Sequence, residues 1–177
     1  MTADRPLVSS FDEHDPHLLA ADVLDQLNRR DGTLATAESL TGGLVAAALT
    51  SIAGSSAVVQ GGLVAYATDA KHHLLGVDPD LIAVHTVVSG EVAGAMAAGA
   101  VTLFASTWAV STTGVAGPER QDDRPVGTVY VGVAGPAGPA SAVTTAQFTL
   151  TGSRESIRAA TVVVALRMLL DRLAPPD

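Results

Sequence analysis

A serine at the end of a short apolar segment is the first residue of this sequence whose position points to chemistry. Residues 33–37 predict a short buried strand, Ser39 follows in a turn, and Gly42 and Gly43 lead into a predicted helix. A helix start presents free backbone N–H groups and a positive dipole end, which suit a phosphate, a carboxylate or a developing oxyanion. Open α/β sheets bind ligands at the carboxyl ends of their strands, where Ser39 stands. The structural alternative is helix capping by Ser39 or Thr41.

A tyrosine and a lysine follow the next predicted strand. Tyr66 ends the strand at residues 58–66, and Lys71 lies one turn into the helix that comes after it. A lysine at this point can direct its amine back toward the mouth of the sheet. The structural alternative is a solvated surface lysine.

Two later segments offer further contacts for a ligand. Thr113 and Gly114 begin a glycine-rich loop after a predicted strand at residues 108–112, and they supply a hydroxyl and a mobile backbone. The alternative for this loop is a plain turn. Arg154 stands at the start of the last predicted helix, where it could bind a phosphate or simply be an exposed residue of the first turn.

Several common catalytic and metal-binding patterns are absent from the sequence. There is no cysteine, which excludes disulfides, thiolate metal sites and cysteine nucleophiles. The glycines after Ser39 lack the Lys-Ser/Thr pair of a P-loop, and Ser39 is not in a G-x-S-x-G elbow. His72 and His73 are adjacent and diverge around their helix, and no H-x-x-x-H pattern occurs. We therefore expect neither a metal nor a cofactor.

The elements that must position these residues alternate between helix and strand. Spacing of apolar residues, glycines and capping residues predicts a single α/β domain over residues 16–174, preceded by a flexible tail at residues 1–15. The predicted strands are residues 33–37, 58–66, 108–112, 127–134 and 142–150. The last two form a predicted hairpin, so the sheet is expected to be mixed and mostly parallel. The fold class is therefore a three-layer α/β/α sandwich.

Composition limits the partners that this domain can have. The net charge is −8 without any run of Lys or Arg, which argues against nucleic acid and anionic membranes as partners. Two uncharged stretches, residues 44–68 and 92–118, are interrupted by glycines and hydroxyl residues, and each resolves into a helix and a strand. The acidic N-terminal segment has no apolar core of a signal peptide, so we expect a cytoplasmic protein. Only 16% of residues are charged, which favours a homodimer or higher homo-oligomer.

An ordered set of short motifs extends over most of the chain. The main ones are residues 36–43 (TAESLTGG), 53–57 (AGSSA), 61–66 (GGLVAY), 74–77 (LLGV), 113–118 (TGVAGP) and 125–129 (PVGTV). Together they resemble the CinA C-terminal domain family, the nicotinamide-nucleotide amidohydrolases, over roughly residues 16–173. The sequence departs from the family pattern at Leu40, where many members carry cysteine, and at residues 119–124, which lack the usual glycines.

The resemblance implies an activity and a set of site residues. The activity is deamidation of nicotinamide mononucleotide, a small-molecule nucleotide, to nicotinate mononucleotide and ammonia. Ser39 is implied as the nucleophile, with Tyr66 and Lys71 beside it. Thr113 and an arginine of the last helix are implied as further site residues, and we favour Arg154 over Arg158 for the arginine.

A mechanism for this activity can be stated as a hypothesis. Lys71 or Tyr66 takes the proton of Ser39, the lysine being able to do so if burial lowers its pKa. Backbone N–H groups at residues 41–43 would hold the oxyanion. Arg154 and the loop at residues 113–117 would hold the ribose and phosphate. The alternative is a non-catalytic module of the same family that binds nucleotides or other proteins without turnover.

Overall fold

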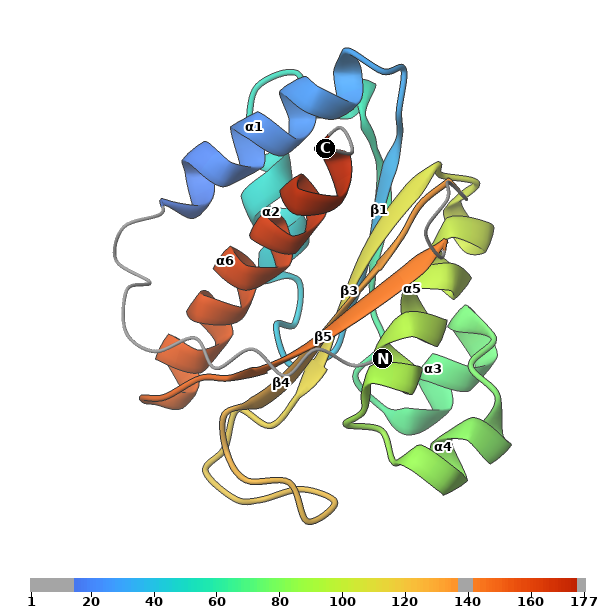
Figure 1. The fold of residues 1–177 in the computed structure, drawn as a ribbon, viewed down its shortest axis with the longest axis vertical. Helices are drawn as coiled ribbons and strands as arrows, with labels where there is room; N and C mark the ends of the chain where they lie inside the picture. Colours follow the sequence, from blue (N-terminus) through green and yellow to red (C-terminus); the bar gives the residue numbers. More distant parts are fainter. Residues whose placement is uncertain (1–14, 137–141, 175–177) are drawn as a thin grey trace.

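A mixed five-stranded sheet carries helices on both of its faces (Figure 1). The structure, a computed structural model, describes residues 15–136 and 142–174. The strands are β1 (Leu34–Glu38), β2 (Val59–Val64), β3 (Trp108–Gly114), β4 (Thr128–Ala134) and β5 (Val143–Thr149). The helices are α1 (Pro16–Asn28), α2 (Leu44–Thr50), the 3-10 helix η2 (Ser55–Ala57), α3 (Thr68–Leu75), α4 (Pro79–His85), α5 (Gly90–Phe104) and α6 (Arg154–Leu173).

The strand order is β2-β1-β3-β4-β5. β1 pairs in parallel with both β2 and β3, whereas β4 is antiparallel to β3 and to β5. Four strands therefore run in one direction and β4 runs against them, which confirms the predicted mixed, mostly parallel sheet. The carboxyl ends of β1, β2 and β3 lie side by side at one edge, so the turns that follow them are brought together.

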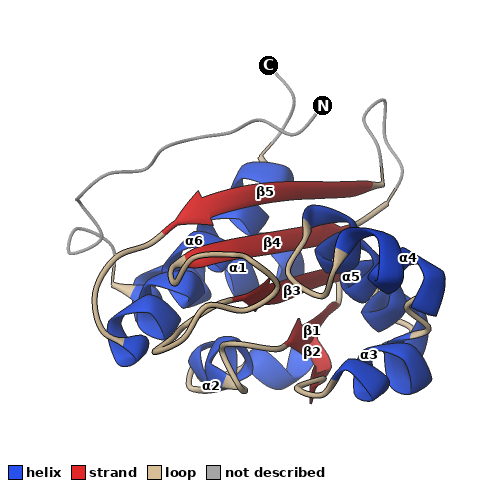
Figure 2. Ribbon diagram, turned by 90° about the horizontal axis from the view of Figure 1, so that it is seen from below, coloured by secondary structure: helices blue, strands red, loops and turns tan. Residues whose placement is uncertain are grey.

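The helices form the two outer layers of the predicted sandwich. Helices α1, α2 and α6 contact one another on one face, and α3, α4 and α5 lie on the other (Figure 2). Most predicted elements differ from the observed ones by one or two residues at their ends. A larger difference concerns Thr113 and Gly114, which were predicted in a loop but end β3, because they continue its antiparallel pairing with Tyr130 and Val129.

Alternation along β1 decides which side chains face which layer. Leu34 packs in the core under α1 and α6, whereas Ala35 and Ala37 pack in the core under α5. The pattern of a strand repeats every two residues, so Glu38 is directed to the α2 side and Ser39 to the α3 side. The sheet therefore presents a carboxylate to one layer and a hydroxyl to the other at the same strand end.

The first helix of the described residues begins with a side-chain cap. Asp15 precedes α1, and its side chain accepts a hydrogen bond of 2.9 Å from the N–H of His17. The other residues of the predicted tail, 1–14, lie outside the described residues. No helix of the described ranges combines the length and the hydropathy needed to cross a membrane.

Candidate active site

The amine of Lys71 lies against the hydroxyl of Ser39. Lys71 Nζ is 3.1 Å from Ser39 Oγ, although the two residues are 32 positions apart in the sequence. The same nitrogen also donates to the carbonyl oxygens of Ala65 at 2.8 Å and of Tyr66 at 3.3 Å. Lys71 is only 2% exposed, and its amine is held by groups at the carboxyl ends of β1 and β2. The solvated lysine considered from the sequence is not what the structure contains.

Burial changes the acidity of this amine, which forms no salt bridge with a carboxylate of the described residues. Desolvation lowers the pKa of Lys71 from 10.5 to about 8, because the charged form loses its water shell. A neutral amine has two N–H groups and one lone pair. The carbonyls of Ala65 and Tyr66 can accept the two N–H groups, which leaves the lone pair for the proton of Ser39. The geometry therefore suits a lysine that removes a proton from serine.

Ser39 is held from both neighbouring strands. Its N–H donates to the carbonyl of Thr112 on β3 at 2.9 Å, and the carbonyl of Glu38 accepts from the N–H of Ala65 at 2.8 Å. Ser39 is half-buried, so its hydroxyl is shielded on the α3 side yet still open to a cavity. The end of β1 is thereby fixed on both sides before the chain turns into α2.

The start of α2 is already occupied by a protein carboxylate. Glu38 accepts from the N–H groups of Gly43 at 2.9 Å, Val45 at 3.0 Å and Ala46 at 2.8 Å. The N–H of Gly42 donates to the carbonyl of Ser39 at 3.1 Å. Two of the three backbone N–H groups predicted as oxyanion donors, those of Gly42 and Gly43, therefore already have acceptors within the protein.

Three predicted substrate-binding residues lie away from the cavity at Ser39. The hydroxyl of Thr41 is buried against that of Thr112 at 2.7 Å. Gly42 and Gly43 adopt left-handed conformations, with φ of 60° and 98°, and they form the turn itself. None of the three lines the cavity. The N–H groups of Leu40 and Thr41 have no acceptor in the part of the chain that the structure describes, and Leu40 does line the cavity.

The cavity at Ser39 has a volume of about 220 Å³. The other six predicted site residues all line it, namely Ser39, Tyr66, Lys71, Thr113, Gly114 and Arg154. Sequence reasoning missed three polar residues of the same wall: Thr68, Glu119 and Gln121. Glu119 and Gln121 belong to a charged stretch whose composition predicts an exposed linker. Nothing in that composition indicates that the stretch lines the cavity.

Tyr66 contacts the site through two different groups. Its carbonyl accepts from Lys71, whereas its phenol oxygen accepts from Arg154 Nη2 at 3.0 Å. The tyrosine is 60% exposed, so the phenol lies at the rim of the cavity and the buried lysine lies at its base. Of the two proposed proton acceptors, only Lys71 is in hydrogen-bond contact with Ser39.

The two arginines of α6 have different positions. Arg154 donates to the carbonyl of Gly117 at 2.6 Å and to Tyr66, and its side chain lines the cavity. Arg158 lies outside the cavity lining and donates to the carbonyls of Leu40 at 3.0 Å and Thr41 at 2.9 Å. Arg154 is therefore placed to meet a ligand, and Arg158 is placed to brace the turn after Ser39.

Thr113 and Gly114 form the β3 side of the cavity. The Thr113 hydroxyl donates to the carbonyl of Val87 at 2.8 Å, which ties the segment before α5 to β3. A Cβ atom on Gly114 would lie 2.6 Å from the carbonyl oxygen of Thr128, so the close approach of β4 requires glycine there. Both residues shape the wall, and Thr113 keeps oxygen lone pairs available to a ligand.

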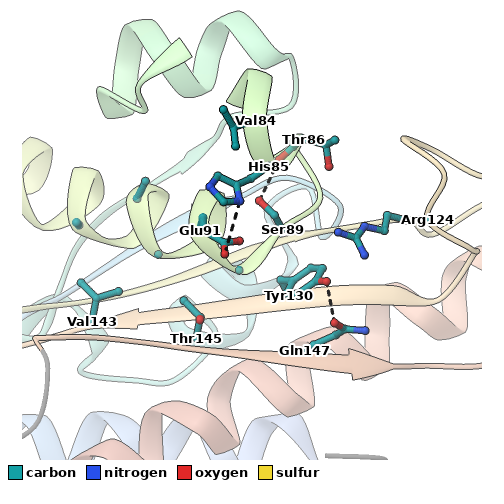
Figure 3. Close-up of a pocket in the computed structure, with 14 residues that line it drawn as sticks. Val84, His85, Thr86, Ser89, Glu91, Arg124, Tyr130, Val143, Thr145 and Gln147 are labelled. Atoms are coloured by element: carbon teal, nitrogen blue, oxygen red, sulfur yellow. Dashed lines mark hydrogen bonds and ion pairs between the residues drawn. The ribbon is translucent and has the colours of Figure 1, made fainter. Parts of the chain in front are cut away.

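A second, larger cavity of about 730 Å³ lies between α5 and strands β4 and β5 (Figure 3). Its polar side chains are mostly engaged with each other: His85 pairs with Glu91 at 3.7 Å, and the Tyr130 hydroxyl donates to Gln147 at 2.7 Å. Ser89 caps α5 and donates to the carbonyl of Thr86 at 3.0 Å. No nucleophile contacts a base in this cavity among the described residues.

Within the described ranges, no group of three or more His, Cys, Asp or Glu residues is arranged to hold a metal ion. A serine, a buried amine of lowered pKa and an arginine at the rim are the groups that a substrate would meet.

Comparison with known proteins gives one consistent family. A family model described as the CinA C-terminal domain matches residues 17–173. A CinA-like protein of Frankia casuarinae is 47% identical over 152 residues, which are 86% of this chain and 34% of the relative. A CinA-like protein of Mycolicibacterium paratuberculosis is 50% identical over 138 residues, which are 77% of this chain and 32% of the relative. The chain thus spans about a third of the length of these curated relatives.

Solved structures resemble the chain over nearly its whole length. The crystal structure of a CinA superfamily protein from Klebsiella pneumoniae has a TM-score of 0.85 at 34% identity, covering 90% of this chain and 98% of that one. A competence/damage inducible protein from Agrobacterium tumefaciens has a TM-score of 0.82 at 37% identity, covering 93% and 97%. The fold described above is therefore one that these proteins share.

Proposed function

Because this chain belongs to the CinA C-terminal domain family, we propose that it is a serine amidohydrolase that deamidates nicotinamide mononucleotide to nicotinate mononucleotide and ammonia. The observation that carries the proposal is the contact of 3.1 Å between Lys71 Nζ and Ser39 Oγ. A buried lysine without a carboxylate partner contributes poorly to stability, and strongly perturbed groups of this kind gather at functional sites.

The proposed reaction proceeds through an acyl-enzyme. Ser39 Oγ attacks the carboxamide carbon while its proton passes to the neutral amine of Lys71. The protonated amine then gives this proton to the departing nitrogen, which leaves as ammonia. In the second half, Lys71 takes a proton from water while the water oxygen attacks the ester carbon. The bond from this carbon to Ser39 Oγ then breaks, Lys71 returns the proton to Ser39 Oγ, and the acid leaves. Each proton that leaves an oxygen thus has one defined acceptor.

The developing oxyanion needs donors that the protein has not already used. The Leu40 N–H meets this condition in the described part of the chain and belongs to a residue that lines the cavity, whereas the N–H groups of Gly42 and Gly43 have acceptors. The Thr41 N–H has no acceptor there either, but Thr41 does not line the cavity, so we assign the oxyanion first to Leu40. Arg158 holds the carbonyl of Leu40, which lies in the same peptide plane as the N–H of Thr41. In a trans peptide these two groups point in opposite directions, so Arg158 directs the Thr41 N–H away from itself.

The size of the cavity limits which part of the substrate is enclosed. Its volume of about 220 Å³ is below the roughly 300–1,000 Å³ of pockets that enclose drug-sized ligands. We infer that the pyridine carboxamide enters the cavity and that the phosphate stays at the rim beside Arg154. A guanidinium is well suited to a phosphate because it can donate two parallel hydrogen bonds.

The test is ammonia release from a panel of amides by the purified protein. The panel consists of nicotinamide mononucleotide, nicotinamide riboside, nicotinamide and the dinucleotide, with Ser39→Ala as the control for background. We expect release from the mononucleotide and loss of release in the variant. Binding of the mononucleotide without ammonia release would favour the non-catalytic alternative, and release from another amide would correct the substrate.

A further inference from the structure

Glu38, the residue before Ser39, has a carboxylate that is buried among backbone N–H groups. Glu38 is 1% exposed and accepts three hydrogen bonds of 2.8 to 3.0 Å from the first turn of α2, with the Thr36 hydroxyl at 3.4 Å as a fourth. Its carboxylate has no salt bridge to a Lys, Arg or His in the described part of the chain. Its charge is therefore compensated by backbone dipoles and by the positive end of the helix.

This arrangement differs from an ordinary helix cap. The usual cap is a side chain of the N-cap residue, but the N-cap of α2 is Gly43, which has no side chain and a φ of 98°. The cap comes instead from the last residue of β1 and reaches over the turn that carries Ser39. One carboxylate thus links the end of β1 to the start of α2 by hydrogen bonds, and residues 39–42 form the turn between the two linked segments.

The direction of the two neighbouring side chains separates their roles. Glu38 is directed to the α2 side of the sheet, where the hydrogen-bond partners of its carboxylate do not line the cavity, whereas Ser39 is directed to Lys71 on the other side. Glu38 therefore acts on the reaction only through the backbone. Moving its carboxylate changes the path of the turn, and with it the distance from Ser39 Oγ to Lys71 Nζ.

We propose that Glu38 is a positioning residue, whose buried carboxylate fixes the turn after β1 so that Ser39 stays within reach of Lys71. The inference deepens the proposed amidohydrolase function and rests on it. The competing explanation is that Glu38 only stabilises α2. That explanation predicts a less stable protein whose folded molecules have the wild-type rate.

Two substitutions and one control distinguish these explanations. Glu38→Gln keeps the shape but turns an NH₂ group toward backbone N–H groups, so at least one hydrogen bond is lost. Glu38→Asp keeps the charge at the helix start but is one methylene shorter. Leu49→Ala is the matched control, because Leu49 is a fully buried residue at the other end of α2 and its truncation destabilises the same helix by lost packing alone.

The readout is kcat per folded molecule, together with the rate at which a fluorophosphonate labels Ser39. We expect Glu38→Gln to lower both by roughly 10- to 100-fold with KM changed less than about threefold, because a displacement of about 1 Å has effects of this size. Glu38→Asp should recover part of the loss. Leu49→Ala should keep both rates within about twofold of wild type although it unfolds at a lower temperature.

Each outcome decides the proposal. Wild-type labelling and kcat in folded Glu38→Gln would overturn it, as would an equal loss in Leu49→Ala. If Glu38→Gln does not fold, Glu38→Asp decides by the same criteria, and failure of both to fold would assign Glu38 to stability alone. Labelling does not depend on the amide used, so a wild type that is labelled but releases no ammonia refutes the substrate and leaves the positioning test intact.

Discussion

The cavity at Ser39 and the cavity beside β5 share a wall. The cavity beside β5 is the larger of the two, but the cavity at Ser39 holds the more reactive arrangement of side chains. Val87 and Val88 line the first, and Thr86 and Ser89 line the second. The second cavity is larger, about 730 Å³ against about 220 Å³. Yet its polar groups are mostly paired in structural contacts, whereas the smaller cavity contains a buried amine against a hydroxyl. Volume alone would favour the larger cavity, whereas a buried amine against a hydroxyl favours the cavity at Ser39, on which the proposed function rests.

The largest difference between the two cavities should appear on removal of the reacting groups. Ser39→Ala and Lys71→Ala should each lower kcat by a factor on the order of 10³ or more, because nucleophile and base act as one unit. Gln147→Ala, in the larger cavity, should stay within about twofold of wild type because the Gln147 side chain accepts a hydrogen bond from Tyr130 and contacts no reacting group of the proposed mechanism. Ammonia release by each variant measures kcat, and circular dichroism checks that each variant is folded. Equal losses in all three variants would remove the distinction between the cavities.

Lys71 also predicts a pH-dependent effect on stability. Its pKa falls from 10.5 in the unfolded chain to about 8 in the folded one, which corresponds to about 3.5 kcal/mol at about 1.4 kcal/mol per unit. Below pH 8 both states bind the proton and the folded protein carries the full cost of a buried ammonium. Between pH 8 and 10.5 only the unfolded chain keeps the proton, so stability rises with pH and the cost disappears.

Lys71→Met is the variant that measures this cost. The free energy of unfolding of wild type relative to Lys71→Met should rise by about 3 kcal/mol from pH 7 to above pH 10. Urea denaturation of both proteins at each pH gives this difference, and effects common to both proteins cancel. A difference that stays constant over this range would mean that Lys71 is not desolvated in the folded protein.

The same ionisation should govern the rate. Only the neutral amine can take the serine proton, so kcat/KM should rise roughly tenfold per pH unit below about pH 8 and level off above it. His85→Ala, which changes the larger cavity, should leave this profile unchanged. A midpoint near the usual histidine pKa of about 6.5, and its loss in His85→Ala, would instead place the base in the larger cavity.

The sequence predicted the position of Ser39 because that position depends on local features. A short apolar strand followed by a serine and two glycines predicts a strand end and a helix start, and both are present. The three-layer fold followed from the order of helices and strands in the same way. Alternation along β1 also places Glu38 and Ser39 on opposite faces, and this signal is already contained in the sequence.

Other features depend on contacts that no local pattern encodes. Thr41, Gly42 and Gly43 were assigned to the substrate because a free helix start was expected, but Glu38 occupies it from outside the usual capping pattern. Arg154 and Arg158 are four residues apart on one helix face, so spacing could not separate them. Arg154 lines the cavity because residues 116–121 lie beside it, and the position of that loop depends on tertiary contacts rather than on local sequence.

The most direct comparison of the two cavities uses one arginine from each, and the expected effect on the kinetic constants is the smallest of those predicted here. Arg154 lines the cavity at Ser39, and its two nitrogens reach Tyr66 and Gly117 at the rim, where we place the phosphate. Arg124 lines the larger cavity and stacks 6.0 Å from the centre of the Tyr130 ring. Arg154→Ala should raise KM roughly tenfold with kcat changed less than about threefold, since it removes binding rather than chemistry.

Arg124→Ala should leave both constants within about twofold of wild type, because the contact of this half-buried side chain with the Tyr130 ring affects only local packing. Arg154→Lys adds a further distinction, since it keeps the charge but cannot donate two parallel hydrogen bonds to a phosphate. We expect its KM to lie between those of wild type and Arg154→Ala. If Arg124→Ala raised KM as much as Arg154→Ala, the phosphate would extend over the shared wall at Val87 and Val88, and the two cavities would then be two halves of one binding site.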